Sequence, residues 1–110
     1  MFPISAALLD AMVLALVSRE ETYGYKITQD IQTAAHVSES TLYPVLRRLQ
    51  KNGALETFDR AYLGRNRRYY RITEEGRSML MQYRIDWALH KTQVDSVLLD
   101  AASIERREDQ

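Results

Sequence analysis

Side chains that can bind phosphates and base edges are concentrated between Ser38 and Gly53, where the sequence is SESTLYPVLRRLQKNG. Apolar residues recur there at spacings of three and four, which predicts a helix of about three turns with one buried face. A helix fits the major groove of DNA, but an ordinary amphipathic helix with a solvated basic face would give the same pattern. This stretch alone therefore leaves both interpretations open. The polar residues on the expected outer face are Ser40, Thr41, Tyr43, Arg47, Arg48 and Lys51.

The ends of this predicted helix are marked by cap and turn residues. Ser38, Ser40 or Thr41 can each accept a hydrogen bond from a free backbone N–H group at a helix start. Pro44 is tolerated only within about the first turn, so we expect the helix to begin between residues 38 and 41. Gly53 can adopt the left-handed conformation that often follows a helix end.

Two helices are predicted before it. Residues 5–18 are apolar almost all round, so this helix should be covered on every side, by the domain or by another subunit. The run is too short to span a bilayer and has no basic leader, which favours a buried helix. Residues 23–35 form the second helix, with Thr22 as its cap. A short polar link joins it to the helix that begins near Ser38, which makes a helix-turn-helix.

Extended chain is predicted after Gly53. Residues 54–60 and 67–73 are rich in strand formers, and Gly64 and Asn66 between them suit a hairpin turn. A hairpin directly after a helix-turn-helix is a wing, which can straddle the DNA backbone or enter a minor groove. The alternative is a charged hairpin whose arginines only keep it soluble. The polar residues at the predicted tip are Arg65, Asn66, Arg67 and Arg68.

The charge of the chain is unevenly distributed. Formal net charge is zero, but residues 47–71 hold eight basic residues against Glu56 and Asp59, a local excess of six positive charges. The remaining segments carry the compensating acids. A neutral chain with one strongly positive region is suited to present that region to an anionic partner.

The last helix is predicted to begin with Thr73 as its cap. Beyond it, apolar residues repeat every seven positions, as in the seam of a coiled coil. We therefore expect this helix to dimerise the chain, with the apolar first helix helping to cover it. The two seam positions hold Leu80, Trp87, Val94 and Ala101, and Tyr83, His90, Val97 and Ile104; the expected dimer contacts are Leu80, Tyr83, Trp87, Val94 and Val97.

Together these elements predict a mainly α fold with a small β-hairpin: a winged helix-turn-helix with a long C-terminal dimerisation helix. The division expected is residues 1–76 for DNA binding and 77–110 for the dimerisation helix and a fraying tail. The chain has no cysteine, and neither His36 nor His90 has ligand spacing around it, so neither a metal nor a cofactor is expected. Enzyme activity is the weakest hypothesis, because no nucleophile or cofactor loop is evident.

Three segments resemble the PadR family of bacterial transcriptional regulators, in its short form with one C-terminal helix. They are YGYKI at residues 23–27, STLYPVLRRLQKNGALE at 40–56 and RRYYRITEEG at 67–76. The resemblance implies a cytoplasmic homodimer that binds a pseudo-palindromic operator and usually represses. It also assigns Ser40, Thr41, Tyr43 and Arg47 to the recognition helix, and Arg65, Arg67 and Arg68 to the wing.

Trp87 matches an aromatic residue that lies beside an effector cavity in the relatives that respond to drugs. The resemblance therefore implies a small aromatic effector at the dimer interface, near Trp87, Tyr83 and His90. The alternative is that Trp87 is a large core residue of the seam.

The leading interpretation is sequence-specific DNA binding by a dimer. A second interpretation is a protein–protein adaptor, in which the winged helix is reused and the last helix pairs with a different chain. The basic cluster on helix and hairpin favours DNA, because an adaptor has no need for it.

Overall fold

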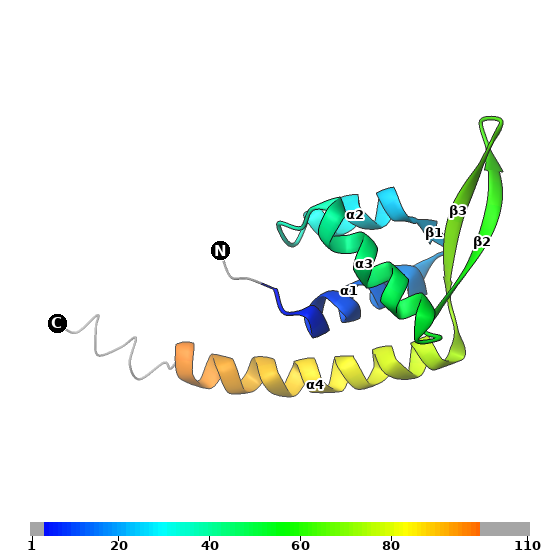
Figure 1. The fold of residues 1–110 in the computed structure, drawn as a ribbon. Coiled ribbons are helices and arrows are strands. Elements are labelled where there is room, and N and C mark those ends of the chain that lie inside the picture. The colour runs from blue at the N-terminus through cyan, green and yellow to red at the C-terminus, as the bar shows by residue number, and fades with distance from the viewer. Residues whose placement is uncertain (1–3, 100–110) are drawn as a thin grey trace.

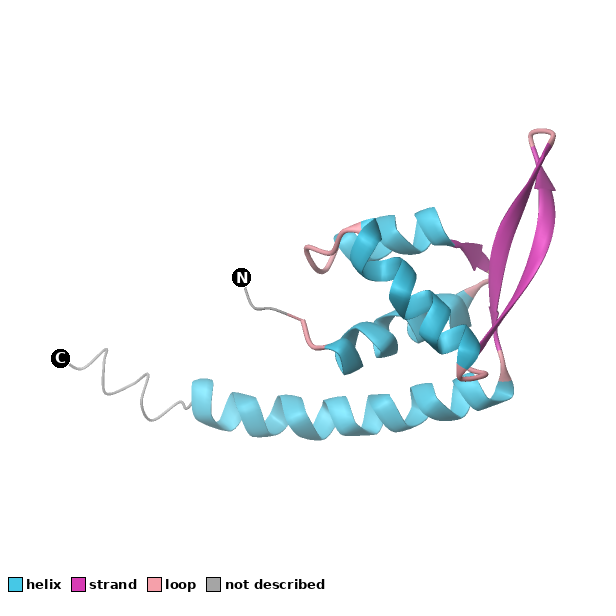
Figure 2. Ribbon diagram, in the orientation of Figure 1, coloured by secondary structure: helices cyan, strands magenta, loops and turns pink. Residues whose placement is uncertain are grey.

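The computed structural model describes residues 4–99, which form four helices and three strands (Figures 1 and 2). The predicted fold is confirmed as mainly helical, with a small antiparallel sheet and a long final helix. In chain order the elements are α1 (Ala6–Arg19), β1 (Thr22–Tyr23), α2 (Gly24–Gln32), α3 (Glu39–Lys51), β2 (Leu55–Tyr62), β3 (Arg65–Ile72) and α4 (Glu74–Leu98).

Three of the helices begin at a hydroxyl cap. The side chains of Ser5, Ser38 and Thr73 each accept a hydrogen bond from a backbone N–H group in the first turn that follows. Ser38 and Thr73 were predicted as caps, and both are confirmed. α3 begins at Glu39, so Pro44 lies in its second turn, later than expected. Pro44 has no N–H to donate, which leaves the carbonyl of Ser40 without its usual partner four residues on.

The prediction for the start of the second helix was wrong. Thr22 and Tyr23 form a short strand opposite Tyr70 and Tyr69 of β3, and α2 begins only at Gly24. Tyr23 occupies the cap position but makes no side-chain cap hydrogen bond. Thr22 and Tyr23 are extended because they pair with β3. Their backbone groups bond to that strand in place of the bonds that they would make inside a helix. α2 also ends at Gln32, three residues earlier than expected.

The hairpin is longer and tighter than predicted. β2 and β3 pair without interruption from Leu55 opposite Ile72 to Tyr62 opposite Arg65. Only Leu63 and Gly64 form the turn, with φ of 51° and 78°. Two consecutive positive φ angles suit the two-residue turn whose twist matches the flanking strands. The sheet order is β1-β3-β2, and the hairpin projects away from the helices (Figure 2).

The core lies where α1, α2 and α3 meet the base of the sheet. The predicted stripe of α3 (Leu42, Val45, Leu46 and Leu49) is buried throughout, and Val13 and Leu14 of α1 are fully buried. Apolar α1 is thus covered within the domain along much of its length. α4 runs beneath this body (Figure 1) and contributes Leu80 to the same core. The expected division after Gly76 therefore falls in the first turn of α4, and the body continues into that helix.

The predicted seam of α4 is used in two different ways. Leu80 is 4% exposed inside its own chain, and Tyr83 packs partly against the same core. These two residues were expected to make dimer contacts, but Leu80 is already covered by its own chain. Farther along, Trp87 is 46% and Val97 78% exposed. The seam positions Ala101 and Ile104 lie outside the described residues. Among residues 4–99, no helix is both long and apolar enough to cross a membrane.

Candidate nucleic-acid interface

The outer face of α3 carries the polar residues that the sequence placed there. Its buried stripe fixes the rotation of the helix, so the opposite side must face solvent. Ser40, Thr41, Arg47 and Lys51 are exposed, and Tyr43 is 38% exposed. The Ser38 hydroxyl lies 2.9 Å from that of Ser40 and 3.1 Å from that of Thr41, at the start of the helix. This end of α3 thus combines hydroxyl groups with free backbone N–H groups.

Arg48 belongs to a different surface. It was grouped with the outer face, but its guanidinium makes an ion pair with Asp10 of α1. Burial raises the pKa of Asp10, and the charge and hydrogen bond of Arg48 oppose that effect. Arg48 is therefore engaged between two helices, while its neighbour Arg47 faces outward.

The predicted wing residues also differ in whether they face solvent or contact other parts of the chain. Arg65, Asn66 and Arg68 are exposed along β3. Arg67 is half-buried, because its guanidinium lies 4.0 Å from the ring centroid of Tyr23 and 3.7 Å from that of Tyr62. Stacking between two aromatic rings restrains the arginine and stiffens the hairpin.

A depression of about 380 Å³ separates the outer face of α3 from the wing. Tyr70 forms part of its lining and is 8% exposed. Burial raises the pKa of the Tyr70 phenol, while Arg68 and Arg47 nearby lower it. A pocket rich in phenol and guanidinium groups fits an oxyanion such as a DNA phosphate. Its lining residues are Tyr23, Gly24, Tyr25, Tyr43, Arg47, Arg67, Arg68 and Tyr70.

Tyr25 and Tyr70 were not among the predicted site residues. Tyr25 is 54% exposed at the start of α2, and it belongs to the YGYKI segment that resembles the PadR family. Gly24 lets α3 approach closely here, because a Cβ at that position would lie 3.0 Å from Cε1 of Tyr43. The sequence shows only a tyrosine between a glycine and a lysine, which is too weak a signal to predict a pocket.

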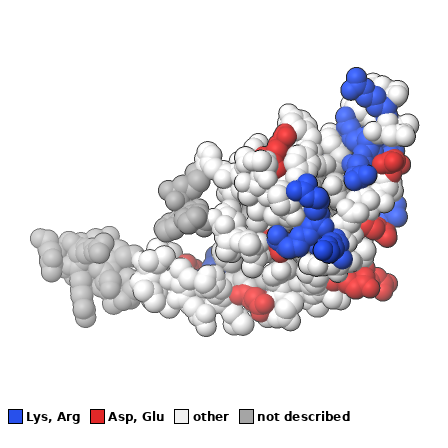
Figure 3. All heavy atoms as spheres, viewed as in Figure 1, with Lys and Arg blue, Asp and Glu red and all other residues white. Residues whose placement is uncertain are grey.

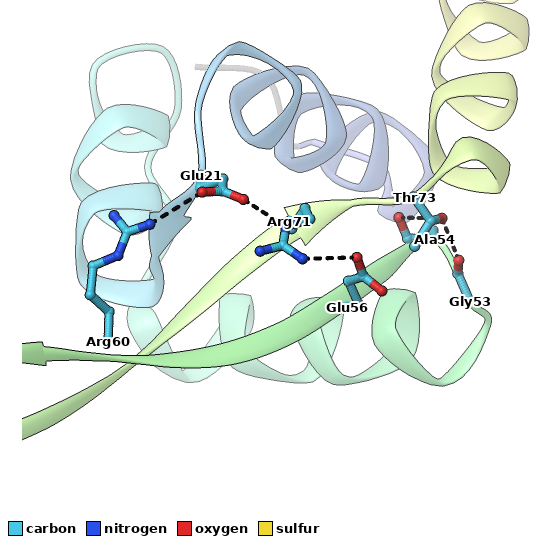
Figure 4. A network of polar contacts seen from close by, with 7 residues as sticks. All are labelled: Glu21, Gly53, Ala54, Glu56, Arg60, Arg71 and Thr73. Atoms are coloured by element: carbon cyan, nitrogen blue, oxygen red, sulfur yellow. Dashed lines mark hydrogen bonds and ion pairs between the residues drawn. The ribbon is translucent and has the colours of Figure 1, made fainter.

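Positive charge gathers on α3 and along the hairpin in Figure 3, whereas several acidic side chains lie toward α4. The free positive charge is smaller than the excess of six counted in the sequence. Arg60 and Arg71 are both paired with Glu21 at the base of the wing (Figure 4). Glu21 accepts from Arg71 Nε at 2.6 Å and from Arg60 Nη2 at 3.2 Å. Arg71 Nη1 also donates to Glu56 at 3.4 Å.

A joint beside this network ties the end of α3, the sheet and the start of α4 together (Figure 4). The Thr73 hydroxyl donates to the carbonyl oxygens of Gly53 and Ala54, and its backbone N–H also donates to Ala54. Gly76 lies against this strand end, and a Cβ there would overlap the Ala54 oxygen and lie 2.7 Å from Cγ1 of Ile72. Only glycine allows α4 to begin so close to β2.

The residues predicted around an effector come together in a second cavity. A groove of about 510 Å³ runs between the start of α1 and α4. Trp87 and His90 face it with ring centroids 6.2 Å apart, and Tyr83 lines it one turn before Trp87. Leu8 and Ala11 of α1 form part of the opposite wall. No cluster of potential metal ligands occurs in the described part of the chain.

A helix-turn-helix followed by a projecting hairpin defines the winged helix-turn-helix class, and this class fits the positive face described above. Residues 13–82 match the transcriptional regulator PadR-like family. The chain belongs to this family and is a transcriptional regulator, as the sequence motifs predicted.

Solved structures and curated relatives agree with this assignment. The fold is similar to that of smu.1704 from Streptococcus mutans, with a TM-score of 0.84, 39% identity and coverage of 88% of this chain and 92% of that one. It is also similar to the PadR-like transcriptional regulator BC4206 of Bacillus cereus, with a TM-score of 0.76, 34% identity and coverage of 82% and 90%. In sequence it is 38% identical over 73 residues to transcriptional regulator Rv3488 of Mycobacterium tuberculosis, covering 66% of this chain and 68% of that protein.

Proposed function

We propose that the chain binds a pseudo-palindromic operator as a homodimer and represses transcription. The observation that carries this proposal is the shared orientation of α3 and the wing. Arg47 on the helix and Arg68 on the hairpin line one depression, so the two elements can engage one DNA segment together. The family resemblance favours repression as the direction of regulation.

The exposed residues divide the work between specificity and affinity. Ser40, Thr41 and Tyr43 lie on the first turns of α3, where side chains of a recognition helix contact base edges. Lys51, Arg65 and Asn66 bind flanking phosphates, which fixes register without reading sequence. One phosphate occupies the depression, held by Arg47 and Arg68 with the neighbouring tyrosine hydroxyls.

The dimer proposal is supported by the incomplete cover of α4. The apolar side chains of Trp87 and Val97 are exposed on the seam, and the groove along α1 lies beside Trp87. A second copy of α4 would bury this surface and set the two recognition helices about 34 Å apart, one turn of DNA. Val94 lies at the middle of the face to be covered.

A small aromatic effector would bind in the same groove. Trp87 offers a flat face for stacking, while Tyr83 and His90 supply polar atoms near it. Such a site would be shared between subunits, so its occupancy would change how the two copies are spaced.

DNA binding is tested by titrating the chain with the DNA upstream of its own coding sequence, against random DNA of the same length. Phosphate contacts by about six to ten cations predict a loss on the order of 10³- to 10⁵-fold in affinity between 50 and 200 mM salt. A chain that binds neither DNA in a salt-sensitive manner would contradict the proposal.

Single substitutions test the division of work. Arg68→Ala should weaken binding to both DNAs, whereas Thr41→Ala should also alter the preferred sequence. Arg84→Ala is the matched control, because it removes an arginine from exposed α4. Equal losses on both DNAs for Arg68→Ala and Thr41→Ala would remove the assigned roles.

A further inference from the structure

One ion pair joins α1 to α3, and neither of its members lines the proposed DNA-binding depression. Asp10 lies in the middle of apolar α1 and is 9% exposed, yet it carries a carboxylate. Arg48, in the second half of α3, pairs with it over a separation of 38 residues. Among the described residues, Arg48 is the only cation paired with Asp10. A charge placed inside an apolar helix costs stability unless its partner stays in place.

Each member of this pair has a sequence neighbour on one of the proposed binding surfaces: Ala11 lines the groove and Arg47 lines the depression. Toward DNA, Arg47 lines the depression, and it precedes Arg48 directly on α3. Toward the groove, burial raises the pKa of the Tyr83 phenol, the charge of Asp10 raises it further, and Arg48 lowers it. Tyr83 packs partly against the core that includes Leu9, the neighbour of Asp10, and it also lines the groove beside Trp87.

The pair joins α1 to α3, and α4 packs against the same body through Tyr83. Asp10 belongs to α1, Arg48 to α3 and Tyr83 to α4. Arg48 lies on the same helix as Arg47, so the pair with Asp10 fixes α3, and with it Arg47, relative to α1.

We propose that Asp10 and Arg48, with Tyr83 beside them, position the recognition helix and couple it to the α1–α4 groove. This inference rests on the proposed function, because it concerns regulation of the same DNA-binding surface. Asp10 and Arg48 are positioning residues and contact neither DNA nor effector through this pair.

Coupling is reciprocal, so DNA binding must change the groove as much as occupancy of the groove changes DNA binding. The chain contains one tryptophan, Trp87, which lies in the groove. Trp87 emission therefore reports the groove without any knowledge of the effector. In the wild-type protein, emission should change as DNA from its own upstream region is added, and it should saturate together with binding.

Asp10→Asn separates coupling from simple electrostatics by the sign of its effect. Removing a negative charge should by itself strengthen binding to DNA. If Asp10 positions α3, Asp10→Asn should instead weaken binding to the upstream DNA by roughly fivefold or more and abolish the change in Trp87 emission. Glu75→Gln, which removes an exposed acid from the first turn of α4, is the charge-matched control.

Two substitutions of Arg48 keep the test decisive if Asp10→Asn does not fold. Arg48→Met should lose the emission change, and Arg48→Lys should retain much of it, since the charge is kept. Unchanged emission in the wild-type protein on binding, or an Asp10→Asn variant that binds as tightly as the wild type with its emission change intact, would overturn the inference. Absence of salt-sensitive DNA binding by the wild type would instead refute the proposed function.

Discussion

α3 and α4 each carry an apolar stripe along one face, but the two stripes differ in how they are covered. On α3, Leu42 is 1% exposed and Leu46 is fully buried, so the chain completes this core by itself. On α4, exposure rises from 4% at Leu80 to 46% at Trp87 and 78% at Val97. A repeat of apolar residues thus predicts that a face will be covered. It does not show whether the cover comes from the same chain.

Leu46→Ala tests whether the stripe of α3 is part of a core that the chain completes by itself. Removing a fully buried leucine should lower the free energy of unfolding by about 2–5 kcal/mol, because the lost contacts leave a cavity. Leu63→Ala is the control, since Leu63 is 85% exposed at the tip of the hairpin and should change stability by less than about 0.5 kcal/mol. Denaturant titration measures both. Equal effects would mean that the body does not have the closed core described here.

Gly76→Ala tests how α4 is attached to the body that contains α3. The added methyl group would overlap the Ala54 carbonyl oxygen, so the root of α4 must shift, at a cost of about 1–3 kcal/mol. Ser78→Ala, an exposed change on the same helix, should have little effect. Thermal unfolding followed by circular dichroism distinguishes the two. A stable Gly76→Ala variant would show that α4 is not held against β2.

Val94→Asp tests whether the exposed part of the α4 seam is covered by a second copy of the chain. In the proposed dimer, a charge at this position must be buried or leave the interface, so the dissociation constant should rise roughly tenfold or more, equivalent to about 1.4 kcal/mol. Gln93→Asp adds the same charge at the neighbouring exposed position and should dimerise like the wild type. Sedimentation over a range of concentrations measures the shift. Identical behaviour of both variants would place the interface elsewhere.

The smallest effect is expected at Glu21, at the base of the wing. The hydrogen bond from Arg71 is the main reason that the pKa of Glu21 lies below its ordinary value of 4.5. A lowered pKa stabilises the fold when the carboxylate is charged, so this contribution is present above pH 4.5 and is lost as the pH falls through the folded pKa. Glu21→Gln should therefore have a slightly lower Tm than the wild type at pH 7, and the difference should vanish in acid. A difference that persists in acid would exclude the ion pairs as its cause.

Local signals predicted much of the fold. Ser38 and Thr73 predict where α3 and α4 begin, because a cap residue bonds within the first turn that follows it. The stripe of α3 follows from a period of 3.6 residues, and Gly64 marks the hairpin turn because it can adopt positive φ. The outward positions of Ser40, Thr41 and Arg47 follow from the same period.

The contacts that were missed join residues distant in sequence. β1 exists because β3 offers an edge about 47 residues later, and no local pattern at Thr22 reveals that. Arg48 looks identical to Arg47 in the sequence, and only the approach of α1 gives it Asp10 as a partner. Arg67 was placed on a free tip, but the ring of Tyr23 lies 4.0 Å from its guanidinium. The depression at Tyr70 likewise requires four elements to meet: β1, α2, α3 and β3.

The joint at Thr73 and Gly76 sets the direction of α4, because it fixes the root of the helix against the end of α3 and the sheet. With 25 residues and a rise of about 1.5 Å per residue, the helix is about 37 Å long. For a helix of this length, a change of about 5° in its direction displaces the far end by about 3 Å. The contacts of Thr73 and Gly76 therefore decide how precisely the far half of α4 is placed relative to α3.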